Sequence, residues 1–253
     1  MKNSGVFTIF SPLVASFLMV ASWIWPNWFY PSLVLGSFFI LWSCYLFYQG
    51  AVDSRYWRLA LPPLLYFLAS FAYLTVISGG WLLWVLVALL FIILVDYLRS
   101  AYFLINDKNS FDFQQRWSSI ALTANILSFF WASAAIFNLQ SFLSLSTWSV
   151  VGVSTFVCFL LSRQWLLARE VQEKEANATS GLAALIGLEV SFGLSLLPFA
   201  PHVLALMFVV TYHFSLQLVW RWLTQSLSPR RRKLYLAVSI TALAMLVISG
   251  GWL

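Results

Sequence analysis

Long apolar runs alternate with short polar connections along this 253-residue chain. Each run is close to the roughly 20 residues that an α-helix needs to cross a bilayer. The runs predict nine membrane-spanning helices over residues 6–25, 29–49, 57–77, 81–103, 117–138, 146–166, 181–199, 202–223 and 234–252. The pattern therefore predicts an all-α polytopic helix bundle, with residues 1–253 in a single transmembrane domain and no separate soluble domain.

Composition excludes a water-soluble protein. Hydrophobic residues make up 62% of the chain, charged residues make up 9%, and the mean hydropathy is +0.87. An average soluble domain carries roughly a quarter charged residues. So few charges cannot cover the surface of a soluble fold of this size.

The net charge of +6 is explained by where the basic residues lie. All 14 Lys and Arg residues lie at the N-terminus or beside the connections 50–56, 104–116, 167–180 and 224–233. No charge lies in the opposite connections 26–28, 78–80, 139–145 and 200–201. We call the side of the membrane on which the N-terminus and the connections 50–56, 104–116, 167–180 and 224–233 lie the basic side. By the positive-inside rule this side is cytoplasmic, so the N-terminus lies inside and the C-terminus outside. The rule also explains the positive net charge, so no nucleic-acid partner is expected.

The sequence predicts a multi-pass protein of a bacterial cytoplasmic membrane, because no luminal domain or processing signal is recognisable. Val20-Ala21-Ser22 makes a poor signal-peptide cleavage site. Cys44 and Cys158 are isolated thiols within predicted helices, so neither a metal site nor a disulfide framework is expected. We expect no cofactor. The expected partners are membrane lipid, other membrane proteins or further copies of the chain.

One seven-residue sequence occurs twice. Val76 to Leu82 is identical to Val247 to Leu253, and both copies fall at the outer end of a helix that runs outward. Matching positions indicate duplication of a helix-hairpin unit. The alternative is independent convergence on a Gly-Gly turn followed by an interfacial Trp.

Two local patterns bear on helix boundaries. The mixed charges from Arg169 to Ser180 have helical spacing, so the sixth helix could extend past the membrane, although a solvated helix end is favoured. Pro62 and Pro63 are expected in the first turns of the third helix, where proline is tolerated.

Glu189 and His213 are the ionisable residues predicted deepest in the membrane. A charge at the bilayer centre is costly, so such a residue is by default a functional hypothesis. Glu189 and His213 flank the short turn at residues 200–201 on consecutive helices and differ in depth by about 3 Å. Helices joined by so short a turn pack antiparallel, so we expect the two side chains to meet near the midplane.

Further polar positions lie at helical spacing. His213, Gln217, Arg221 and Thr224 form a stripe that runs toward the basic side, and Gly187, Ser191 and Ser195 form a small-residue face for close packing. Asp96 precedes Arg99 by about one turn, and Asn125 shares a face with Ser118 and Ser128. The candidate polar cluster is Glu189, His213, Gln217, Asn125, Asp96 and Arg221. No residue is assigned a catalytic role, because no known catalytic motif is recognisable.

Three functions remain open. The favoured one is a non-enzymatic membrane subunit or scaffold, in which the polar residues form interhelical hydrogen bonds. A transporter or channel for a small or lipid-like solute would place Glu189 and His213 in a cavity, with Asp96 and Arg221 as a cytoplasmic gate. An intramembrane enzyme acting on a lipid or polyprenyl substrate would instead direct Asp96, Arg99 and Arg163 at a phosphate.

Overall fold

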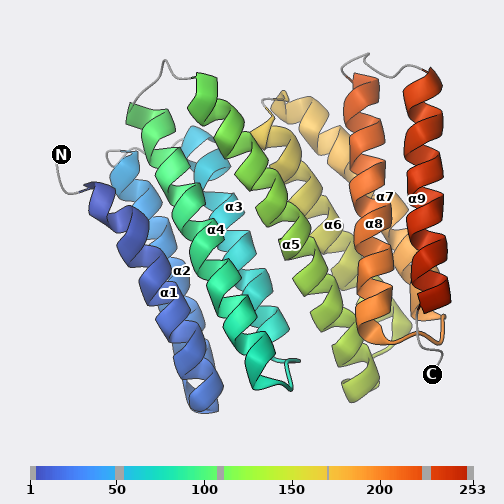
Figure 1. Cartoon of the computed structure of the whole chain (residues 1–253), viewed down its shortest axis with the longest axis horizontal. Coiled ribbons are helices and arrows are strands. Elements are labelled where there is room, and N and C mark those ends of the chain that lie inside the picture. The colour runs from blue at the N-terminus through green and yellow to red at the C-terminus, as the bar shows by residue number, and fades with distance from the viewer. Residues whose placement is uncertain (1–3, 49–53, 107–110, 170, 224–228, 250–253) are drawn as a thin grey trace. The chain divides into compact units, whose positions relative to one another are not determined.

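A computed structural model describes residues 4–48, 54–106, 111–169, 171–223 and 229–249, and these residues form nine α-helices and two short 3-10 helices (Figure 1). The α-helices are α1 (Phe7–Ile24), α2 (Phe29–Phe47), α3 (Ser54–Leu74), α4 (Gly80–Asn106), α5 (Phe111–Leu143), α6 (Thr147–Ala168), α7 (Glu173–Ser195), α8 (Pro201–Leu223) and α9 (Pro229–Ser249). The predicted all-α class is confirmed.

Eight of these helices, α1 to α8, are long and apolar enough to cross a membrane. The chain is therefore a multi-pass membrane protein. Helix α9 begins with the basic run Arg230 to Lys233, which leaves a shorter apolar stretch before the helix ends at Ser249. The predicted ninth span, 234–252, ends outside the described residues, so it stays a prediction.

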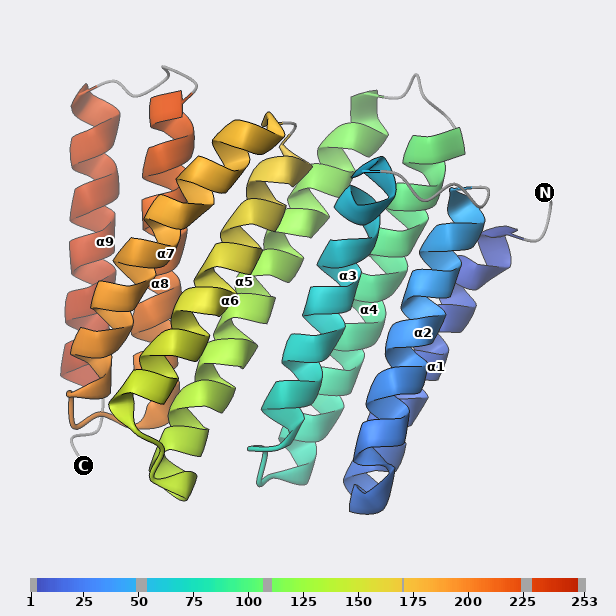
Figure 2. The ribbon, with the colours of Figure 1, turned by 180° about the vertical axis from the view of Figure 1, so that it is seen from behind.

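The chain forms two compact units, and the boundary between them falls inside α5. The N-terminal unit, Met1–Ser128, packs α1 against α2 and α4, and α3 against α2 and α4. The C-terminal unit, Phe129–Leu253, packs α7 between α6 and α8, with α9 against α8. Figure 2 shows α6 and α7 side by side, and theirs is the largest helix–helix contact among the described residues.

The charged run between the sixth and seventh spans belongs, from Glu173 onward, to α7 rather than to α6. Helix α6 ends at Ala168 and α7 begins at Glu173, well before the predicted start at residue 181. Acidic residues in the first turn of α7 interact favourably with its helix dipole. Arg163 of α6 donates hydrogen bonds of 2.7 Å to Glu173 and 2.6 Å to Asn177. The alternative of an extended sixth helix is therefore wrong, and the favoured solvated helix end is found at the exposed start of α7 rather than at the end of α6.

The two prolines of α3 lie in the helix interior, because the helix begins at Ser54. The prediction that they occupy its first turns was wrong. Pro63 has no N–H, so it cannot bond the carbonyl of Leu59 one turn earlier. The hydroxyl of Tyr97, a fully buried residue of α4, donates to that carbonyl at 3.2 Å. The neighbouring helix thus satisfies the acceptor that the proline leaves open.

Replacing Tyr97 with Phe is expected to lower the free energy of unfolding of the purified chain by about 0.6–1.7 kcal/mol, the range of interhelical hydrogen bonds in membranes. Titration with SDS in mixed micelles measures the loss. Tyr30→Phe is the matched control, because the Tyr30 side chain is 76% exposed. Equal effects of the two substitutions would mean that the Tyr97 bond contributes nothing.

The repeated heptapeptide has two conformations where both copies are described. Residues 76–78 lie in the turn before α4, whereas residues 247–249 are the last residues of helix α9. Residues 250–253 of the second copy lie outside the described residues. Identity of sequence therefore does not give identity of structure here, and the duplication stays a prediction.

Candidate functional site

The tightest helix packing in the C-terminal unit is a seam of small side chains between α6 and α7. Small residues let helix backbones approach closely in a membrane, where apolar burial does not by itself favour association. The buried small residues of the seam are Ser154, Cys158 and Ser162 on α6 and Ala176, Ser180, Ala183, Ala184, Gly187 and Ser191 on α7. The predicted small-residue face of α7 is thus confirmed for Gly187 and Ser191, while Ser195 is only half-buried.

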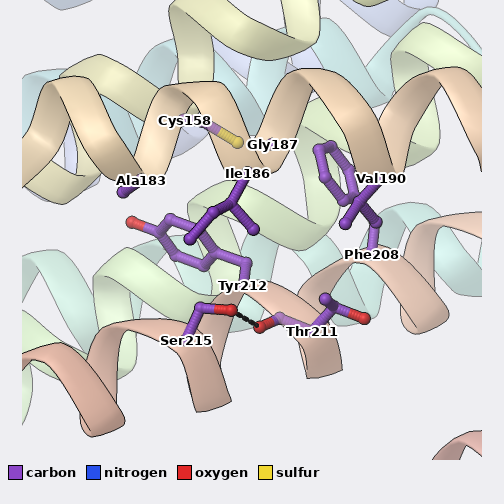
Figure 3. Close-up of a pocket in the computed structure, with 9 residues that line it drawn as sticks. All are labelled: Cys158, Ala183, Ile186, Gly187, Val190, Phe208, Thr211, Tyr212 and Ser215. Carbon is purple, nitrogen blue, oxygen red and sulfur yellow. Dashed lines mark hydrogen bonds between the residues drawn. The ribbon is translucent and has the colours of Figure 1, made fainter.

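Gly187 sets the distance between the two helices. A β-carbon added at this position would overlap Sγ of Cys158 and lie 3.0 Å from its Cβ. The thiol of Cys158 is buried and unpaired with any other cysteine, and it points at Gly187 (Figure 3). A glycine is therefore required where α7 crosses Cys158.

A small pocket lies beside this crossing and is lined by α6, α7 and α8 (Figure 3). Its lining residues are Cys158, Ala183, Ile186, Gly187, Val190, Phe208, Thr211, Tyr212 and Ser215. The hydroxyls of Thr211 and Ser215 donate to carbonyls of their own helix at 2.9 and 2.8 Å. The lining carries no ionisable acid or base apart from the thiol and the phenol, and it includes neither Glu189 nor His213.

Glu189 is exposed on the outer face of α7. Gly187 faces α6, and two residues further along a helix is a rotation of about 200°, so Glu189 points away from the seam. No hydrogen bond or ion pair joins its carboxylate to any residue that the structure describes. His213 is half-buried on α8, within electrostatic range of Arg169. The predicted contact between Glu189 and His213 is therefore not formed.

The other predicted residues are placed as follows. In the N-terminal unit, the carboxylate of Asp96 accepts a hydrogen bond of 2.8 Å from Arg116, and Asn125 is buried. In the C-terminal unit, Gln217 and Arg221 are half-buried on α8. The end of the predicted stripe, Thr224, lies outside the described residues. The stripe and the gate both stay predictions.

A cluster at the basic side of the C-terminal unit was not anticipated. The guanidinium of Arg169 lies over two indole rings, 4.2 Å from the Trp165 ring and 4.8 Å from the Trp220 ring. Burial, and then the positive charge of Arg221, lower the pKa of Arg169. The sequence shows that Trp165 and Arg169 are one turn apart, but it does not show that α8 brings Trp220 beside them.

A second unanticipated pair joins α5 to α8 inside the C-terminal unit. The side-chain amide of Asn138 donates to the carbonyl of Ala134 at 2.7 Å and lies 3.1 Å from Nδ1 of His202. Asn138 is buried and His202 is exposed at the start of α8. The pair holds the uncharged ends of two helices against each other.

Among the described residues, no group of three or more His, Cys, Asp or Glu side chains could hold a metal ion. Comparison with protein-family models, with curated proteins and with solved structures found no match to this chain.

Proposed function

We propose that this chain is a non-enzymatic membrane subunit that binds a transmembrane helix of another protein on the outer face of α7. The observation that supports the proposal is the position of Glu189. Its side chain shares the exposed face of α7 with Leu185 and Phe192, among others. That face would otherwise contact lipid.

A carboxylate in contact with lipid tails is costly near the bilayer centre, where a charged residue needs a partner or a proton. Glu189 lies six residues, or about 9 Å, before Ser195 at the uncharged end of α7, within the apolar part of the helix. A transporter would place such a group in an internal cavity. An outward carboxylate is instead suited to binding a second helix.

The charge of Glu189 indicates the chemistry of its partner. Every Lys and Arg of this chain lies near the basic side, so a second copy can offer none at the depth of Glu189. Two α7 helices packed face to face would bring one carboxylate against another. The partner that fits is a different protein whose transmembrane helix carries Lys or Arg at the matching depth.

Photo-cross-linking in the membranes of the source cells tests this assignment. A benzoylphenylalanine placed at Phe192, one turn beyond Glu189, is expected to capture a protein whose cross-linked helix contains Lys or Arg near its middle. Breaking a desolvated charge pair costs about 2 kcal/mol or more, which corresponds to roughly 30-fold weaker binding. Glu189→Leu should therefore remove the adduct, while Glu189→Asp should retain part of it.

The same cross-linker at Trp84, which is 63% exposed on α4, is the control for non-specific capture. Adducts with lipid alone, with a second copy of the chain, or with a helix that has no basic residue would each contradict the proposal. An adduct at position 192 that survives Glu189→Leu unchanged would contradict it as well.

A further inference from the structure

The Arg169 cluster at the basic side has the form of an anion site. Arg169 immediately follows the last residue of α6, and its guanidinium contacts the faces of Trp165 and Trp220. The two indoles meet edge to face at 82°, with ring centroids 6.0 Å apart. Both rings therefore hold the guanidinium in one place, and Trp165 is only 2% exposed.

Stacking uses the faces of a guanidinium and leaves its edge unoccupied. Arginine has five N–H donors in the plane of the group, in a fork that matches the oxygens of a phosphate. No hydrogen bond joins the guanidinium of Arg169 to any of the described residues. The indole Nε1 of Trp165 is likewise a buried donor without a partner in the described part of the chain. Both side chains thus have donors without an acceptor among the described residues.

Positive charge is concentrated at the same point. Arg221 lies in the last turn of α8, close enough to Arg169 to disfavour its charged form. Arg163, six residues before Arg169, forms an ion pair with Glu173 at 2.7 Å. Two guanidinium groups that repel each other in a partly buried site are stabilised by an anion between them.

The place of the cluster indicates which anion reaches it. It lies where α6 and α8 end, at the level at which Trp residues and basic residues contact lipid headgroups. A phospholipid presents its phosphate at this depth with acyl chains directed along the helices. We propose that Arg169, held between Trp165 and Trp220 and beside Arg221, binds the phosphate of a phospholipid, with anionic lipids preferred.

Lipid titration of the purified full-length chain, followed by native mass spectrometry, tests the site. The probes are phosphatidylglycerol, phosphatidylcholine and inorganic phosphate at equal concentrations. Of the three probes, phosphatidylglycerol is expected to bind with the highest affinity, so its complex should still be detected at the lowest concentration tested. Arg169→Gln should weaken its binding about tenfold or more, as loss of a charged hydrogen bond implies. Arg169→Lys should retain only part of the affinity, because it keeps the charge and loses the planar fork.

Lys174→Gln is the matched control, because it removes the same charge from an exposed residue near the same side of the membrane. The proposal is overturned if phosphatidylglycerol binds the Arg169→Gln and Lys174→Gln chains equally well. Equal binding of inorganic phosphate and phosphatidylglycerol would overturn the lipid assignment and identify a site for a free anion. If Arg169→Gln does not fold, the comparison of Arg169→Lys with the wild-type chain decides the question.

Discussion

Replacing Gly187 with Ala is expected to lower the free energy of unfolding by about 1–3 kcal/mol, the usual cost of overpacking a well-filled contact. The new methyl group would overlap the thiol of the buried Cys158 and lie 3.0 Å from its Cβ, so rotation of the thiol alone does not relieve the contact. Helices α6 and α7 would have to separate along their whole seam. Unfolding by SDS in mixed micelles, followed by circular dichroism, measures the loss.

The same helix provides the control for this substitution. Gly193 lies one and a half turns further along α7, and an added β-carbon there meets nothing within 4 Å. Gly193→Ala should therefore be neutral or stabilise the chain by up to about 1 kcal/mol, because alanine is the better helix former. Similar free energies for the two variants would show that α6 and α7 are not in close contact at Gly187.

Phe129→Ala is the second substitution with a large expected effect. The Phe129 ring is fully buried and stacks on Tyr212 of α8, with centroids 3.8 Å apart and planes within 9°. It also packs against Phe208 at 4.9 Å. The unfolded helices remain in lipid, so the cost is loss of packing rather than loss of apolar burial. A cavity the size of a phenyl ring then costs about 2 kcal/mol.

Phe142→Ala, on the same helix, provides the comparison. The Phe142 side chain is 73% exposed, so its removal opens no internal cavity. Its free energy of unfolding should stay within about 0.5 kcal/mol of that of the wild-type chain, as is usual for surface positions. A loss equal to that of Phe129→Ala would show that the stacked rings add no stability to the C-terminal unit.

The sequence predicted the helices well because length and hydropathy determine which segments can cross a bilayer. It predicted poorly which face of each helix is buried, because lipid-facing and buried side chains are both apolar. Glu189 was expected inside, since polar residues in membrane bundles usually face the interior. The small-residue face through Gly187 and Ser191 was the better guide, because a helix that buries Gly187 must turn Glu189 outward.

Other differences come from contacts between distant segments. Pro63 was placed at a helix start because the span was counted from its apolar residues, whereas α3 already begins at Ser54. The Arg169 cluster needs the end of α8 beside the end of α6, which no local pattern reports. Asp96 was predicted to form a gate with Arg221, and its hydrogen bond with Arg116 of the next helix was not predicted.

The outward carboxylate of α7 also bears on how the chain enters the membrane during synthesis. A charged residue disfavours insertion of a helix, by up to about 2.5–3.5 kcal/mol at the helix centre, so Glu189 makes α7 a weaker insertion signal when it emerges alone. Helix α6 precedes it by only the residues 169–172 and presents the matching seam. The translocon would therefore release these two helices into lipid as a pair.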